Sequence, residues 1–315
     1  MRLALHALHD ELRRLKSAGV STVAVSEEGL VALRRAVTSL ARNTGGAREL
    51  RATTNILVPA VVSAVPTAYE PPPFRPAQVA ASGGASAPAV TLPPAPVVTL
   101  PSGDKATRWA ALHEQVVNDP TCRSNVRAGK KIVLGVGAFD AKIMFVGEAP
   151  GAEEEIQGEP FVGPAGQLLT KMIQAMGLKR GDVYIGNIMN WRPQMPKVDG
   201  REQVGNRPPH EAEMRYCLPY LKAQIEVVNP DLLVALGTTA AQGLLGFGSF
   251  AALGDIRGKW HAFAGKPLMV TYHPSYILRN QSNRSKRMIW EDLIKVMERA
   301  ALPVSEKQRG FFLDR

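Results

Sequence analysis

Apolar residues in the second two-thirds of the chain alternate between short continuous runs and longer helical patterns. Four runs predict buried strands, at 143–146, 183–188, 232–236 and 268–272. Apolar positions recur at helical spacing between and after them, at 167–176, 209–228, 239–245 and 285–301. This alternation predicts an α/β domain with three layers, in which a central four-stranded parallel sheet has helices on both faces.

The first 48 residues show a different pattern, typical of a helical hairpin. Two such helices bury too little apolar surface to be stable alone. We expect residues 1–48 to form an arm that docks on the chain or binds a protein or DNA partner. The leucines and valine that repeat at helical spacing are Leu5, Leu8, Leu12 and Leu15, then Leu30, Leu33, Val37 and Leu40.

Prolines are concentrated between the arm and the α/β segment. Eleven of the 24 prolines of the chain lie between Pro59 and Pro101. A stretch rich in proline, alanine and serine predicts an extended linker without a packed core. We therefore divide the chain into an arm (1–48), a flexible linker (49–105), a folded domain (106–303) and a short tail (304–315).

Composition narrows the class of partner. The formal net charge of +10 favours an anionic partner, nucleic acid first. No apolar run is long enough to cross a bilayer, and no signal peptide is recognisable. Two cysteines give no disulfide framework, which is typical of a cytoplasmic protein.

Polar side chains gather where the predicted strands end. Glu148 follows the first strand, Asn187 ends the second and His273 follows the fourth. Because parallel strands end at one edge of a sheet, the three side chains should face one crevice. The chain lacks the phosphate-binding GK[ST] loop, the GxSxG nucleophile motif and the HExxH and CxxC metal motifs. The crevice is therefore predicted to hold acid, amide and imidazole chemistry without a metal.

Four motifs carry a resemblance to a known family: G-E-A-P-G, G-E-P-F-V-G-P-A-G, N-I-x-x-W-R-P with N-R-P-P, and Y-H-P-S-Y-I-L-R. Together they resemble the uracil-DNA glycosylase superfamily, closest to family 4, the thermophile type. The resemblance implies an enzyme of base excision repair. Such an enzyme flips deoxyuridine out of DNA and hydrolyses its N-glycosidic bond to leave an abasic site.

The resemblance also implies the residues that bind the flipped base. Phe161 would stack on the uracil ring, and the Asn187 amide would read its N3–H and O4 edge, which separates uracil from cytosine. Gly147 and Ala149 would line the same pocket.

Three catalytic residues are implied as well. His273 would donate a hydrogen bond to O2, where negative charge develops as uracil leaves. Glu148 would stabilise the cationic sugar or orient water. Glu154 would lie near the C5 edge and exclude the methyl group of thymine.

Contacts to DNA are expected from two loops. Ile277 would enter the base stack as a wedge, while Ser275, Tyr276 and Arg279 would lie near phosphates. An insertion between Pro193 and Asn206 adds Lys197 and Arg201, which we also expect at phosphates.

One departure from the resemblance concerns the cofactor. Family 4 enzymes usually hold a [4Fe–4S] cluster with four cysteines. Here only Cys122 and Cys217 remain, while Trp191 and a position near Asp119 stand where the other two would be. We therefore expect no cluster, no other cofactor and a corner packed by Trp191.

The motifs together predict a monofunctional, monomeric uracil-DNA glycosylase whose partner is DNA containing uracil. Two alternatives stay open: a glycosylase for another damaged base, and a module that binds uracil or DNA without cutting. The sequence leaves open the base range beyond uracil and the preference for single or double strands.

Overall fold

The computed structural model describes residues 92–195, 203 and 205–313. The predicted arm, the predicted linker up to residue 91, Lys197 and Arg201 lie outside these residues. The described end of the predicted linker, residues 92–104, contains no helix or strand. Its side chains Leu92, Val98 and Leu100 nevertheless pack against the core of the α/β domain, so this part of the chain is extended and docked.

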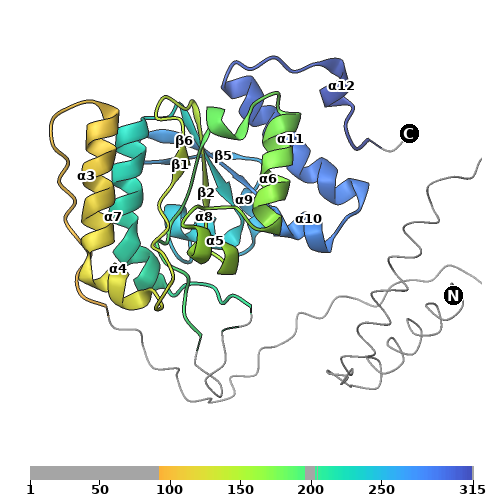
Figure 1. Ribbon diagram of the computed structural model, residues 1–315. Helices are drawn as coiled ribbons and strands as arrows, with labels where there is room; N and C mark the ends of the chain where they lie inside the picture. Colours follow the sequence, from red (N-terminus) through yellow and green to blue (C-terminus); the bar gives the residue numbers. More distant parts are fainter. Residues whose placement is uncertain (1–91, 196–202, 204, 314–315) are drawn as a thin grey trace, which may run out of the picture. The chain divides into compact units, whose positions relative to one another are not determined.

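The sheet has four parallel strands at its centre, as predicted (Figure 1). They run side by side in the order β3, β2, β4 and β6. Their bounds are β2 (Ile143–Gly147), β3 (Tyr184–Asn187), β4 (Leu232–Leu236) and β6 (Lys266–Thr271). In β2, β3 and β4 every residue is buried, because helices cover both faces of the sheet.

Two edge strands extend the predicted four-stranded sheet to six among the described residues. β1 (Val136–Gly137) pairs antiparallel with β3, and β5 (Trp260–Phe263) pairs antiparallel with β6. Neither carries a clear apolar run, because an edge strand with one exposed face needs none. The β5–β6 hairpin turns through Ala264 (φ 48°) and Gly265 (φ 73°). Positive φ at both central residues is typical of the tight turn that joins antiparallel strands.

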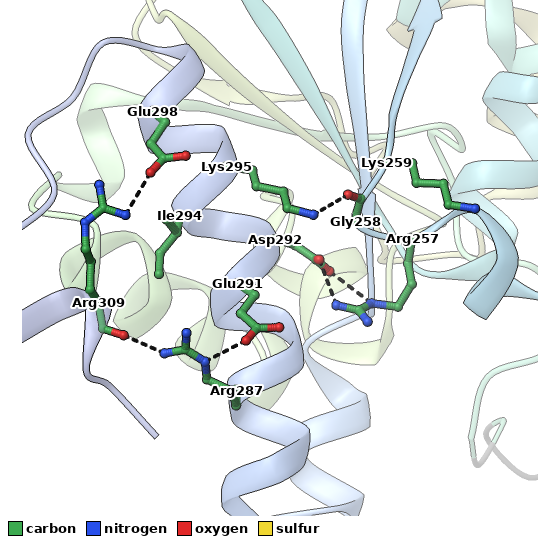
Figure 2. A pocket seen from close by; sticks show the side chains of 10 residues that line it. All are labelled: Arg257, Gly258, Lys259, Arg287, Glu291, Asp292, Ile294, Lys295, Glu298 and Arg309. Carbon is green, nitrogen blue, oxygen red and sulfur yellow. Dashed lines mark hydrogen bonds and ion pairs between the residues drawn. The ribbon is translucent and has the colours of Figure 1, made fainter. Parts of the chain in front are cut away.

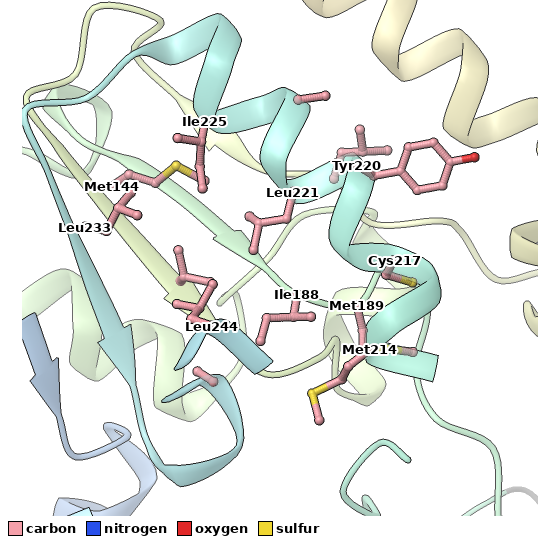
Figure 3. Packing of buried hydrophobic residues seen from close by; sticks show 14 of the residues in the cluster. Met144, Ile188, Met189, Met214, Cys217, Tyr220, Leu221, Ile225, Leu233 and Leu244 are labelled. Carbon is pink, nitrogen blue, oxygen red and sulfur yellow. The ribbon is translucent and has the colours of Figure 1, made fainter. Parts of the chain in front are cut away.

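One face of the sheet is covered by four helices, and α3 packs against α7 there. Figure 3 shows Met144 and Leu233 of the sheet against Leu221 and Ile225 of α7. The predicted helical patterns at 209–228 and 239–245 are confirmed by α7 and α8, within one or two residues at their starts. The four helices are α3 (Lys105–Asn118), α4 (Pro120–Asn125), α7 (Glu211–Val228) and α8 (Thr238–Leu245).

The opposite face is covered by α6 (Pro164–Ala175) and α11 (Asn283–Arg299). Ile143 and Phe145 point to this second core, while Met144 and Val146 point to the first. This alternation is the period of two that a strand imposes on its side chains.

Short helices occupy the connections. α5 and α10 follow β2 and β6, at the edge where the parallel strands end (Figure 1). α12 lies in the predicted tail, where Gln308 Nε2 donates to the Ala175 carbonyl at 2.8 Å. None of the described helices is both long and apolar enough to span a membrane. The short elements are α5 (Ala152–Gln157), the 3₁₀ helix η1 (Arg180–Asp182), α9 (Leu253–Ile256), α10 (Ser275–Arg279) and α12 (Glu306–Arg309).

Candidate active site

Asn187 and Gly147 face each other at the carboxyl ends of β3 and β2, where they are register partners. Asn187 is 5% exposed, and its Oδ1 has no hydrogen-bond partner among the described residues. A β-carbon on Gly147 would lie 2.4 Å from that Oδ1 and 2.5 Å from Cζ of Phe161. The space above Gly147 therefore depends on glycine. A buried acceptor without a donor at such a point is suited to bind a ligand that supplies the donor.

Phe161 is held in a backbone conformation that side chains other than glycine seldom adopt, with φ 54°. Two neighbours fix it there. A β-carbon on Gly166 would lie 1.8 Å from the Phe161 carbonyl oxygen, so α6 can approach only because residue 166 is glycine. Arg180 Nη2 donates to the Pro160 carbonyl at 2.6 Å. The ring is 6% exposed and lies 5.6 Å, centroid to centroid, from the ring of His273.

His273 follows β6 and is held by the residues that come after it. The backbone N–H of Ser275 donates to His273 Nδ1 at 3.2 Å, and the Ser275 hydroxyl lies 2.9 Å from the same atom. Because Nδ1 accepts, the neutral ring carries its proton on Nε2. Burial, with a smaller contribution from Arg279, lowers the pKa of His273 to about 4. The imidazole is thus a neutral hydrogen-bond donor at physiological pH.

Glu148 and Ala149 are half-buried and line a groove of about 620 Å³. The groove continues to His273 and Tyr276 on its other wall. Burial raises the pKa of Glu148, and the Thr239 side chain acts in the opposite direction. The structure thus brings together Gly147, Glu148, Phe161, Asn187 and His273. The strand ends predicted this for Glu148, Asn187 and His273, and the family resemblance implied it for Gly147 and Phe161.

Glu154 accepts hydrogen bonds from the backbone of two loops beside the pocket. Its Oε1 accepts from the backbone N–H groups of Val162 and Gly163, each at 3.0 Å. Its Oε2 accepts from the Gly151 N–H at 3.1 Å. Both oxygens are occupied by backbone donors. The carboxylate therefore ties the G-E-A-P-G loop to the loop that carries Phe161, and the catalytic role of Glu154 stays a prediction.

The α10 segment carries the residue predicted to act as a wedge. Ile277 is 9% exposed and packs in the second core, whereas Leu278 is 42% exposed. The prediction for Ile277 stays a prediction, and the exposure of its neighbour makes Leu278 a second candidate for the wedge. Ser275 and Arg279 are also partly engaged within the protein, because Arg279 Nη1 donates to Ser275 Oγ at 3.2 Å. The Tyr276 ring stacks on Tyr272 at 4.3 Å.

Two arginines that sequence reasoning did not assign hold the far wall of the groove. Arg192 is buried and donates to Glu155 Oε1 at 2.8 Å and to the Gly205 carbonyl at 2.6 Å. Arg207 lines the groove and forms a bidentate pair with Glu213 at 2.7 and 2.8 Å. Both belong to the W-R-P and N-R-P-P motifs, which supplied the signal that could have identified them.

A third unassigned arginine, Arg257, faces Asp292 of α11 (Figure 2). Arg257 makes a bidentate ion pair with Asp292 of α11, at 2.7 and 3.1 Å. Asp292, which is 1% exposed, also accepts from the Thr271 hydroxyl at 2.7 Å. The Arg257 guanidinium lies 5.2 Å from the centroid of the Tyr272 ring. Thr271 and Tyr272, which directly precede His273, therefore contact Asp292 and Arg257, respectively.

Cys122 and Cys217 lie in a buried corner of the first core together with Trp191. Burial raises the pKa of both thiols, and for Cys122 the nearby Cys217 adds to the effect. The Trp191 ring is fully buried and lies 6.1 Å from that of Tyr216. A standard [4Fe–4S] cluster needs four thiolates, and the chain has two cysteines. The residues of this corner therefore do not fit that group. In the described part of the chain, no three His, Cys, Asp or Glu side chains are grouped to hold a metal ion.

Comparison with known proteins agrees with the geometry. Residues 134–294 match the Uracil DNA glycosylase superfamily, to which this chain belongs. Its relatives include the type-4 uracil-DNA glycosylase of Thermotoga maritima, 42% identical over 52% of this chain and 80% of the relative. The type-4 enzyme of Pyrobaculum aerophilum is 39% identical over 56% of this chain and 87% of the relative. A type-5 uracil-DNA glycosylase of the same organism is 31% identical, over 52% and 73%.

Proposed function

We propose that this protein is a uracil-DNA glycosylase, which removes uracil from DNA by hydrolysing the N-glycosidic bond. The observation that carries the proposal is the unpartnered Asn187 Oδ1, nearly buried beside the Phe161 ring over Gly147. An amide offers one acceptor and two donors in a fixed plane. It matches the N3–H donor and O4 acceptor of uracil, and it mismatches cytosine, which has an acceptor at N3 and an amino group at C4.

Phe161 and His273 complete the base pocket in this proposal. The apolar ring face of Phe161 stacks on the flipped base, which offsets part of the few kcal/mol that unstacking costs. The Nε2–H of His273 donates to uracil O2. This hydrogen bond strengthens as negative charge accumulates on O2. Since the ring is neutral, it stabilises that charge as a hydrogen-bond donor, without transferring a proton.

Glu148 acts on the sugar. As the C1′–N1 bond breaks, its electron pair passes to the uracil ring and positive charge develops at C1′ and the ring oxygen. The Glu148 carboxylate stabilises this charge and orients the water that adds to C1′. The added water releases a proton, which the uracil anion takes up, so the products are neutral uracil and an uncharged abasic sugar. Glu154 and Ser275 position Phe161 and His273 for this reaction.

The rest of the chain enters the proposal as follows. Leu278 is the wedge in the base stack, with Tyr276 and Arg279 near phosphates, and Lys197 and Arg201 are further phosphate contacts. The reaction uses no iron–sulfur cluster, since the two buried thiols and Trp191 do not fit one. The enzyme acts as a monomer in the cytoplasm, and residues 1–48 serve to bind a partner.

The test is excision from a labelled oligonucleotide that contains one deoxyuridine, followed by alkali. An alkali-labile break with the wild type, strongly reduced in His273→Ala, would support both the activity and the pocket. Tight binding of uracil-containing DNA without a break would instead favour a module that binds without cutting. A break at hypoxanthine or a mismatched pyrimidine but not at uracil would favour another base.

Selectivity supplies a second test. Asn187→Asp loses the N–H₂ group that faces O4 and places a carboxylate there, so uracil excision should fall. Excision of uracil over cytosine should become less selective. Unchanged selectivity in this variant would contradict the role of Asn187.

A further inference from the structure

A second groove at the same edge of the domain carries an excess of positive charge. Its volume is about 640 Å³, close to that of the groove beside His273. We call it the α4 groove, defined by Arg123, Arg127, Lys130, Lys131, Gly158 and Glu159. Four of these side chains are basic, and Glu159 is the one carboxylate in the described lining.

The topology places the α4 groove next to the base pocket. Lys105, at the start of α3, donates to the Val228 carbonyl at the end of α7, so α3 begins at the edge where the parallel strands begin. Its far end and α4 therefore lie at the opposite edge, with α5 and α10 (Figure 1). Glu159 precedes Phe161 by two residues, which span at most about 7 Å. That distance is about two nucleotide steps along a DNA strand, at about 3.4 Å each.

Three basic side chains of the α4 groove, Arg123, Arg127 and Lys131, form no ion pair with a carboxylate of the described residues. The Arg123 guanidinium makes no hydrogen bond or ion pair with any other described residue, and the side chain is exposed. Arg127 donates to the Gln203 side chain, and Lys131 Nζ donates to the Gln157 carbonyl at 3.3 Å. Because these acceptors are uncharged, the positive charge of the donors remains available to an anion.

A groove of similar size, about 610 Å³, provides the contrast (Figure 2). It too is lined by several basic residues, yet each of its three arginines pairs with a carboxylate. The pairs are Arg257 with Asp292, Arg287 with Glu291 and Arg309 with Glu298. Basic residues alone thus do not distinguish the two grooves. The difference is that Arg123, Arg127 and Lys131 of the α4 groove form no ion pair with a described carboxylate.

We propose that the α4 groove binds the phosphodiester backbone of the DNA that flanks the target nucleotide. The proposal rests on the proposed glycosylase function. Lys131 links the groove to the pocket, because its side chain packs on the Gly158 turn and its backbone N–H donates to the Glu155 carbonyl at 2.7 Å. A phosphate held at Lys131 therefore lies against the loop that leads to Phe161, and it fixes the register of the strand for base flipping.

The experiment measures binding of the full chain to oligonucleotides that contain 2′-fluoro-deoxyuridine. The electronegative substituent disfavours the cationic sugar, so the bond survives the measurement. Fluorescence anisotropy at several salt concentrations gives the slope of log K against log salt. One oligonucleotide has long flanks, and a second is trimmed to the target and its immediate neighbours.

Arg123→Ala/Lys131→Ala should bind the long oligonucleotide about tenfold more weakly, with a slope shallower by about 1 to 2. It should bind the trimmed one as the wild type does. The matched control is Lys266→Ala/Lys307→Ala, which removes the same charge from the opposite edge, where β6 begins and α12 lies. The control should keep the wild-type slope. Wild-type affinity of the groove variant for the long oligonucleotide, or equal losses on both oligonucleotides, would overturn the proposal.

Excision of ordinary deoxyuridine by the wild type separates this proposal from the proposed function. A shallower slope in the groove variant, together with no excision by the wild type, would refute the glycosylase function and support DNA binding by the α4 groove. Excision by the wild type, together with an unchanged slope in the groove variant, would support the glycosylase function and refute DNA binding by the α4 groove. Both substituted side chains are exposed, so the thermal unfolding midpoint should stay at the wild-type value and exclude a folding defect.

Discussion

Ser275 donates its backbone N–H to Nδ1 of His273, which fixes the tautomer and makes Nε2 the donor toward the base pocket. The same burial that lowers the pKa of His273 to about 4 raises the pKa of Glu148 above its ordinary 4.5. At neutral pH the pocket therefore combines an uncharged imidazole with a charged carboxylate. As the pH falls, Glu148 takes up its proton before His273 does.

The first prediction is an acid limb in the pH profile that belongs to Glu148. The excision rate at saturating enzyme should show no inflection caused by His273 at pH 6.5, the ordinary pKa of histidine, because the pKa of His273 is lowered to about 4. It should fall at lower pH as the carboxylate is neutralised, with an inflection above 4.5, since the pKa of Glu148 is raised. Glu148→Gln should be slower and lack this limb. A limb near pH 6.5 that persists in Glu148→Gln would show that His273 titrates normally, contrary to its buried, Ser275-bonded geometry.

The second prediction concerns Gly147. In Gly147→Ala the new β-carbon would approach Asn187 Oδ1 and the Phe161 ring at about 2.5 Å, so both must shift. Overpacking of this kind costs about 1–3 kcal/mol of stability. A displacement of about 1 Å at a reacting site can cost about 100-fold in rate. Excision should thus fall at least about 100-fold while the protein stays folded, as judged by circular dichroism.

The matched control for Gly147 is Gly181→Ala. No atom lies within 4 Å of a β-carbon at Gly181. Its excision rate and unfolding midpoint should equal those of the wild type. Full activity of Gly147→Ala would mean that the flipped base does not use the space between Asn187 and Phe161.

The contrast between Gly147 and Glu154 shows what the sequence could and could not predict. The strand ends that carry Glu148, Asn187 and His273 followed from apolar runs, because parallel strands end at one edge. The use of Glu154 depends on where a folded loop points its backbone N–H groups, which no periodicity encodes. Likewise Ile277 and Leu278 are both apolar neighbours in α10. Only packing against the second core shows which one is exposed.

The same limit applies to the sheet edges and to Arg257. β1 has two residues, too few to form a pattern. Arg257 meets Asp292 across 35 positions of sequence, and a long-range ion pair leaves no local signal. The four central strands were predictable because burial on both faces makes them continuously apolar.

The third prediction separates the two residues of α10. Leu278→Ala removes an exposed side chain, so stability should change by less than about 0.5 kcal/mol. Excision from duplex DNA should fall about tenfold, because a wedge offsets the cost of unstacking. Excision from single strands, where little stacking is lost, should change little. Ile277→Ala should instead lower the unfolding free energy by about 2–4 kcal/mol, as buried isoleucine truncations do. If Leu278→Ala and Ile277→Ala were equally stable and reduced duplex excision equally, the assignment of Leu278 as the wedge would be contradicted.

The fourth prediction tests whether the Arg257–Asp292 pair positions His273. Asp292 is nearly fully buried, so removing either partner leaves the other charge without its counterpart. Each single variant should therefore lower the free energy of unfolding, measured in urea, by about 3 kcal/mol. Both single variants break the same contact. The double variant Arg257→Ala/Asp292→Ala should therefore lose less stability than the two single variants added together, with a coupling energy above about 1 kcal/mol. Arg257→Lys keeps the charge but loses the planar fork and should be intermediate.

A merely structural ion pair would lower stability and leave the turnover of the folded enzyme unchanged. Here Asp292 holds the Thr271 hydroxyl and Arg257 lies over the Tyr272 ring, directly before His273. At a temperature where each variant is fully folded, kcat should therefore fall while KM changes little, since His273 acts on the leaving base. The control is Arg309→Ala, which breaks the exposed pair with Glu298 and should keep the wild-type kcat. Wild-type kcat in folded Arg257→Ala would limit this pair to stability, and the position of His273 would then not depend on it.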